Sequence, residues 1–227
     1  MASIFELALG QDFGRLHPML RKRFGVDTSA GYACIGQGVF SEVRRGAWWT
    51  RPFLRLGSYR NILFPGQGRH IPFTIENYPY TDGLGRPTVT FVRTLELPRA
   101  RKHRFDATMV HSAQRGGIVD YLGTRQHLAT DLQLEVLDDG TLHLRTGALR
   151  FYEGPLAFTV PAIFTGTADL YEGYDDERGV LTVRMQVANP VFGFLFGYRG
   201  EFSCTFPPIS DVGVPADLKP LREEIRE

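Results

Sequence analysis

Apolar and polar residues alternate with a period of two along most of this chain. Apolar side chains take every second position in the segments 71–75, 132–136 and 181–187. This pattern predicts β-strands with one face toward a core and the other toward water. Turn sequences separate such segments at short intervals, so we expect about ten strands joined mostly as hairpins. Examples of these turns lie at 81–87, 114–117, 138–140 and 174–179.

Strands with one apolar face must bury that face, either between two sheets or inside a barrel. A meander with helices packed at its ends favours the barrel. We therefore expect a mainly β fold, an antiparallel meander closing into a lipocalin-like β-barrel of about 8–10 strands with short N-terminal and inserted helices. The length of 227 residues and the 43% hydrophobic content fit one domain spanning 1–227.

The segment 1–25 is expected to form a helical lead-in, because its apolar residues lie three or four positions apart. Gly10 and Pro18 divide it into two short helices. The barrel is expected over 31–207, with a helical insertion near 48–63 that Thr50 caps and Gly57 weakens. The remaining residues, 208–227, form either a short helix or a frayed tail.

The strand "FVRTLEL" carries an arginine on its apolar face. Val89, Phe91, Leu95 and Leu97 share that face with Arg93. A guanidinium stays charged and is costly to bury without partners. Arg93 is therefore expected to meet either an acidic side chain, as a structural ion pair, or an oxygen-bearing ligand.

Four further polar residues belong to strands whose apolar faces are expected to point inward. His111 shares a face with Met109, and is either a core histidine or a proton-transfer group. Asp120 is either inside or at a solvated edge. Glu172 is either a buried carboxylate or has emerged into solvent beside the 174–179 turn. Tyr198 could offer a hydroxyl to the interior.

A barrel of this size leaves room for a small ligand among mostly apolar walls. We expect Phe91, Met109, Phe202 and Tyr198 to contact that ligand together with Arg93. The candidate catalytic residues are Arg93, His111, Asp120 and Glu172.

Several classes of function are not expected. The formal net charge of +1 gives no general attraction to nucleic acid or an anionic membrane. The N-terminus resembles neither a signal peptide nor an anchor, and no apolar run is long enough to span a membrane, so we expect a cytoplasmic protein. Nucleotide-binding and metalloprotease motifs are missing from the sequence. We therefore expect no cofactor and no metal site, and the oligomeric state stays open.

Several segments in order resemble a bacterial family of unknown function, domain-of-unknown-function family 4166. They include "LHPMLRKRFG" (16–25), "FVRTLEL" (91–97), "RFDATM" (104–109), "GGIVDYLG" (116–123) and "NPVFGFLFGYRGEF" (189–202). The resemblance implies a compact domain, and its pattern includes an aromatic residue two positions before the arginine and a closing Tyr-Arg-Gly. It thereby adds weight to Arg93 and Tyr198, but it implies no established reaction.

Three hypotheses follow. In the first, the barrel binds an apolar, natural-product-like substrate and acts as a cofactor-independent cyclase or isomerase. Arg93 then steadies a carbonyl or enolate oxygen while His111, Asp120 or Glu172 moves a proton. In the second, the same pocket is a non-catalytic carrier for a lipid or hydrophobic metabolite. In the third, a barrel filled by side chains is a structural or interaction domain, with Trp48 and Trp49 meeting a partner.

Overall fold

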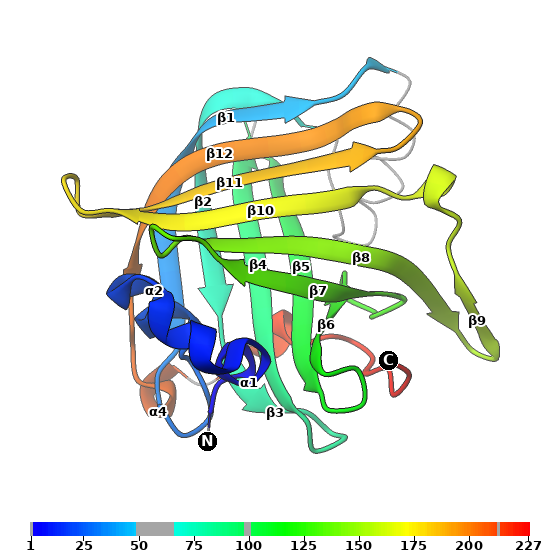
Figure 1. The fold of residues 1–227 in the computed structure, drawn as a ribbon, viewed down its shortest axis with the longest axis horizontal. Coiled ribbons are helices and arrows are strands. Elements are labelled where there is room, and N and C mark those ends of the chain that lie inside the picture. Colours follow the sequence, from blue (N-terminus) through cyan, green and yellow to red (C-terminus); the bar gives the residue numbers. More distant parts are fainter. Residues whose placement is uncertain (1, 49–65, 98–100, 213) are drawn as a thin grey trace.

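A computed structural model describes residues 2–48, 66–97, 101–212 and 214–227 of the chain. Within these residues, ten antiparallel strands form a closed barrel in which each strand pairs with its neighbours in sequence, and β12 pairs with β1 to close the ring (Figure 1). The strands are β1 (Cys34–Arg45), β2 (Gly68–Asn77), β4 (Pro87–Leu97), β5 (Arg101–Ser112), β6 (Gly117–Leu122), β7 (Leu128–Val136), β8 (Leu142–Glu153), β10 (Thr167–Asp175), β11 (Val180–Asn189) and β12 (Gly193–Thr205). The expected lipocalin-like meander is confirmed.

Two short strands lie beside this ring. β3 (Pro79–Thr81) pairs with β4, and β9 (Leu156–Thr159) pairs with the end of β8. β10 pairs with the start of β8, at Leu142–Arg145, whereas β9 pairs with its end, at Arg150–Glu153, and projects away from the barrel (Figure 1).

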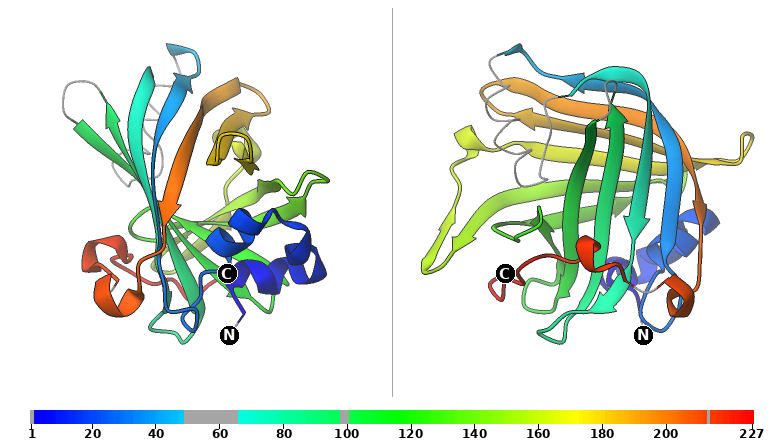
Figure 2. Two further views of the ribbon diagram at one scale, coloured as in Figure 1. Left: turned by 90° about the vertical axis from the view of Figure 1, so that its left-hand side faces the viewer. Right: turned by 180° about the vertical axis from the view of Figure 1, so that it is seen from behind.

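The N-terminal segment covers one end of the barrel. It comprises α1 (Ile4–Leu9), the 3₁₀ helix η1 (Gly10–Arg15) and α2 (Pro18–Phe24), which lie across that end in both views (Figures 1 and 2). Ser3 caps α1 and Pro18 opens α2, as expected for helix starts. Phe5 and Phe24 are buried with their ring centroids 4.6 Å apart. The structure thus contains the two short helices that the apolar spacing predicted.

Strands β1, β4, β6, β8 and β11 end at the opposite end of the barrel, which we call the open end. It holds η3 (Ala162–Phe164) and the turn between β11 and β12. The expected helical insertion near 48–63 falls, from residue 49 onward, outside the described residues.

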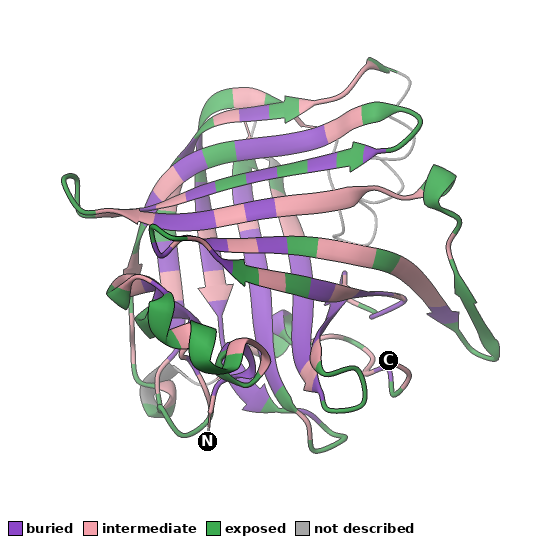
Figure 3. Ribbon diagram, in the orientation of Figure 1, coloured by how far each residue is buried: buried purple, intermediate pink, exposed green. Residues whose placement is uncertain are grey.

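The C-terminal segment covers the outer face of the sheet. α4 (Ile209–Val212) and η4 (Ala216–Leu218) precede an extended tail whose Arg226 carbonyl accepts a hydrogen bond from Tyr121 at 2.9 Å. The tail therefore packs on the barrel and is not frayed. Beneath it lies a second apolar cluster of Val110, Val119, Tyr121, Ala129 and Tyr152. Both faces of β5 and β6 are consequently buried over much of their length (Figure 3).

Candidate functional site

The barrel encloses a cavity of about 500 Å³ between its two ends. Its wall is mostly apolar and comes from β4 to β8, β10, β11 and the segments at the open end. Apolar lining residues include Phe24, Phe91, Phe105, Met109, Leu122, Leu144, Leu149, Phe151, Leu170, Met185 and Val187. Such a volume and wall are typical of a small-molecule pocket, and they do not fit a barrel filled by side chains.

Arg93 lines this cavity from β4. It is only 5% exposed, and its guanidinium carbon lies 5.8 Å and 5.4 Å from the ring centroids of Phe91 and Phe105. Among the described residues it forms no side-chain hydrogen bond and no ion pair within 4.0 Å. Contact with two aromatic rings does not satisfy five N–H donors. Within the described part of the chain, Arg93 is therefore a buried cation whose N–H donors have no acceptor.

Asp120 lines the same cavity from β6, opposite Met109 of β5 and Thr130 of β7. It is 5% exposed, and its Oδ1 atom is buried without a hydrogen-bond partner in the described structure. Burial raises the pKa of Asp120 to about 7, against the opposing attraction of Arg93. The alternation of residues did not decide whether Asp120 is inside or at an edge, and the structure places it inside. Its carboxyl group can gain or lose a proton near neutral pH.

Glu172 is buried, so it has not emerged into solvent, but its partner is not Arg93. Arg23 of α2 donates to both carboxylate oxygens, with Nε–Oε2 at 2.7 Å and Nη2–Oε1 at 3.3 Å. Its Nη1 also donates to Asn77 Oδ1 at 2.7 Å and to Cys34 Sγ at 3.3 Å. Burial lowers the pKa of Arg23, but the charge and hydrogen bonds of Glu172, together with Cys34 and Cys204, outweigh it, so the net pKa is raised. Glu172 touches the cavity with its charge already neutralised.

Arg23 was missed by the sequence reasoning, although a signal was present. It lies three residues after Leu20 and next to Phe24, both buried, and so belongs to the apolar stripe of α2. An arginine on that stripe is as anomalous as Arg93 on its strand.

His127 was also missed as a site residue. It lines the cavity at the start of β7, where its Nδ1 faces the Tyr152 carbonyl at 3.2 Å and Glu153 Oε2 at 2.5 Å. Its Nε2 is buried without a partner among the described residues. Since His127 precedes the strand, period-two alternation gave no signal for it. The C-terminal tail holds this loop, because Glu224 N–H donates to Gln126 Oε1 at 2.7 Å.

The other expected site residues lie at different distances from the cavity. Phe91 and Met109 line it. Phe202 is buried but packs near Arg23, whose guanidinium carbon is 5.1 Å from the ring. Tyr198 is buried with its hydroxyl unpartnered in the described structure, and burial raises its pKa. His111 is half-buried near the end of β5 and is not a lining residue, so its proposed role gains no support.

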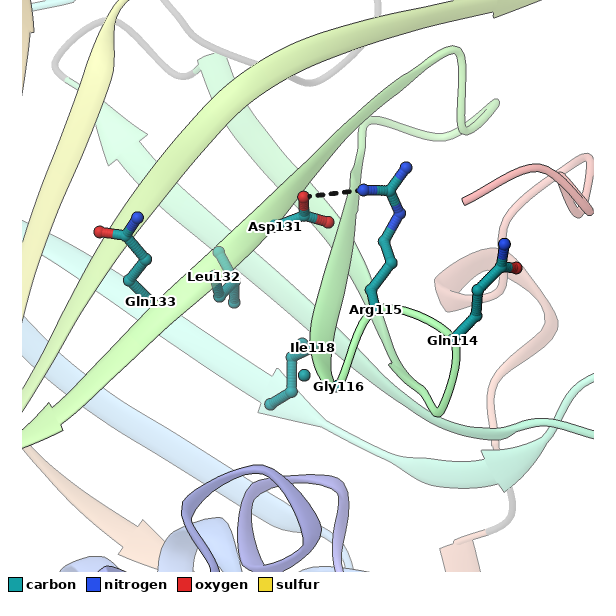
Figure 4. A pocket seen from close by; sticks show the side chains of 8 residues that line it. Gln114, Arg115, Gly116, Ile118, Asp131, Leu132 and Gln133 are labelled. Atoms are coloured by element: carbon teal, nitrogen blue, oxygen red, sulfur yellow. Dashed lines mark hydrogen bonds and ion pairs between the residues drawn. The ribbon is translucent and has the colours of Figure 1, made fainter.

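A smaller depression lies beside the β5–β6 turn and β7 (Figure 4). Its two charged residues pair with each other, since Arg115 Nη1 lies 3.1 Å from Asp131 Oδ2.

The described residues hold no group of three or more potential metal ligands. The part of the chain that the structure describes also has no helix long and apolar enough to cross a membrane. The third hypothesis named Trp48 and Trp49 as residues that meet a partner. Trp48 is exposed, and Trp49 lies outside the described residues.

The fold and interior define a closed antiparallel barrel with an apolar cavity and a buried cation. A family model described as a domain of unknown function (DUF4166) matches residues 16–202, so the chain belongs to this family. The uncharacterized protein YndH of Bacillus subtilis (strain 168) is 30% identical over 202 residues, which cover 89% of this chain and 97% of that protein. The ordered motifs noted in the sequence are therefore those of a recognised bacterial family.

Proposed function

We propose that this protein binds an apolar small molecule with an oxygen-bearing group inside its barrel, and acts on it as a cofactor-independent cyclase or isomerase. The observation that carries the proposal is Arg93, a buried cation in an apolar cavity of about 500 Å³ that has no hydrogen-bonding partner among the described residues. A carbonyl, carboxylate or enolate oxygen would accept hydrogen bonds from this guanidinium. The aromatic and aliphatic wall would hold the rest of the ligand.

The catalytic part rests on the placement of Asp120 in the same cavity wall. Its ionised carboxylate would remove a proton from the carbon next to a carbonyl group, and Arg93 would stabilise the enolate oxygen that forms. Return of that proton to another carbon of the conjugated system gives an isomer. Attack of the enolate carbon on a second carbonyl group of the same molecule, with the proton delivered to the new alkoxide, gives a ring.

The pKa of Asp120, at about 7, suits this role because both protonation states are populated near neutral pH. His127 supplies a second candidate proton-transfer group, since its Nε2 is buried and unpartnered among the described residues and its Nδ1 faces a carbonyl.

A carrier is the second candidate function, and the apolar wall favours it. In this case Arg93 would pair with a carboxylate head group, and Asp120 would move no proton. The two functions share the pocket and differ only in turnover.

Native mass spectrometry of the purified protein tests for a bound molecule, and chromatography after incubation tests whether that molecule changes. Binding can be followed with cis-parinaric acid, a fluorescent polyunsaturated fatty acid. We expect Arg93→Leu to remain folded and lose at least tenfold in affinity, about 1.4 kcal/mol. Arg184→Leu, which removes an exposed arginine over Tyr171, is the matched control. Unchanged binding by Arg93→Leu, with greater stability, would instead indicate a structural arginine.

A further inference from the structure

Six large apolar side chains are exposed in three segments at the open end of the barrel. They belong to β9, to η3 and to the turn between β11 and β12, and their exposed fractions range from 44% to 63%. We call them the apolar rim: Leu156, Phe158, Ile163, Phe164, Val191 and Phe192. Clustered exposure of this kind marks an interaction surface.

The apolar rim is continuous with the cavity. Ile163, Phe164 and Phe192 are exposed to solvent and also line the interior. An apolar molecule can therefore pass from whatever the rim contacts to the cavity along apolar side chains.

Asn189 holds two parts of the rim in place. Its amide nitrogen lies within hydrogen-bond distance of the Ala162 and Ile163 carbonyl oxygens, at 3.2 Å and 3.0 Å. Its Oδ1 accepts from the backbone N–H groups of Val191 and Phe192, at 2.8 Å and 2.9 Å. A buried residue thus holds the backbone of η3 and of the β11–β12 turn together.

Four arginines at the open end have no ion-pair partner among the described residues. Arg44, Arg45, Arg69 and Arg125 lie at or next to strand ends of the open end, and none forms an ion pair within 4.0 Å among the described residues. Arg44 lies over Phe194, which follows the rim in β12, at 5.4 Å from the ring centroid. At the opposite end, acidic turn residues have basic partners: Asp82 pairs with Arg86, Asp138 with Arg15, and His17 lies 3.3 Å from Asp176.

We propose that the open end docks on an anionic lipid bilayer, with the apolar rim inserted among the lipids and the arginines on the phosphate groups, and that the ligand enters the cavity from the bilayer. The docking deepens the proposed function and rests on it for the nature of the ligand. Exposed aromatic and aliphatic groups flanked by arginine are the composition of interfacial membrane-binding surfaces. A second copy fits less well, because a symmetric contact between two open ends would bring the arginines of both copies together.

Flotation with phosphatidylcholine vesicles, with and without phosphatidylglycerol, tests the docking. We expect the protein to float with the anionic vesicles, and the double variant Phe158→Ser/Val191→Ser to bind them at least tenfold more weakly. Leu84→Ser, an equally exposed apolar residue in a turn at the opposite end, is the matched control. Arg44→Glu/Arg125→Glu should also lose binding, whereas Arg21→Glu on α2 should not. Equal flotation of all variants, or none by the unmodified protein, would overturn the docking.

Binding of cis-parinaric acid in vesicle-free buffer separates this proposal from the proposed function. Phe158 and Val191 do not line the cavity, so their double variant should bind the probe as the unmodified protein does. Probe binding without flotation contradicts the docking and leaves the pocket function intact. Flotation without probe binding supports the docking and contradicts the pocket function. Dimerisation in light scattering that Phe158→Ser/Val191→Ser abolishes, without flotation, would assign the rim to a second copy.

Discussion

Arg23 and Glu172 form a two-point ion pair inside the barrel, between a helix and a strand 149 residues apart in sequence. Their side chains are 0% and 1% exposed. The pair joins α2 to β10 across the covered end, while Asn77 and Cys34 accept the remaining hydrogen bonds of Arg23. This arrangement neutralises Glu172, whereas Arg93 and Asp120 face the cavity with polar atoms that have no hydrogen-bond partner among the described residues.

Glu172→Gln should destabilise the protein by about 3–5 kcal/mol, because it leaves the guanidinium of Arg23 buried without its counter-ion. Urea unfolding monitored by circular dichroism measures this loss. Glu177→Gln, in the exposed β10–β11 turn, is the control and should have little effect. The double variant Arg23→Met/Glu172→Leu should recover part of the loss, since no unpaired charge remains. If the double variant lost as much free energy of unfolding as the two single variants lose in sum, this account of the pair would be contradicted.

Asp120 should make stability depend on pH between about 4 and 7. In this interval the folded protein keeps a proton that the unfolded chain has lost, because the pKa is about 7 in the folded state and 3.8 ordinarily. The free energy of unfolding therefore falls as the pH rises, by about 4 kcal/mol in total for about three pKa units. Asp120→Asn should remove most of this slope and be the more stable protein at pH 8. Parallel pH profiles for the two proteins would show that Asp120 titrates normally.

Arg93 should be found to hold the pKa of Asp120 down. Arg93→Met removes the positive charge that opposes the effect of burial, so the pKa of Asp120 should rise further above its value of about 7. Titration of the carboxyl carbon by NMR spectroscopy measures this shift directly. Arg184→Met on the exposed face of β11 should leave it unchanged. A lower pKa in Arg93→Met would mean that the two groups do not interact as the structure indicates.

Asn189 should control the order of the open end. Asn189→Ala removes the acceptor of the Val191 and Phe192 N–H groups, so these amides should exchange with deuterium roughly 10–100 times faster. Gln186→Ala, an exposed position on the same strand, is the control. Exchange rates that match in the two variants would show that the turn is ordered without Asn189.

Local pattern was a good guide wherever only one face of an element was buried. Alternation placed Arg93 on the interior face of β4, and apolar spacing placed two short helices before the barrel. Alternation did not show which face of β6 points inward, because the C-terminal tail buries Val119 and Tyr121 on one face while Asp120 is buried on the other. With both faces apolar, period two carries no information about which side is inside.

By itself, the sequence determined the class of fold, the number of strands to within a few, and the anomaly at Arg93. These properties follow from the identity and order of neighbouring residues, which decide backbone geometry and the facing of each side chain. Only the tertiary structure decided which charges meet. It paired Glu172 with Arg23, left Arg93 and Asp120 facing one cavity, and brought His127 to the same wall. Contacts between residues so distant in the chain depend on how the barrel closes, and strand alternation does not encode that.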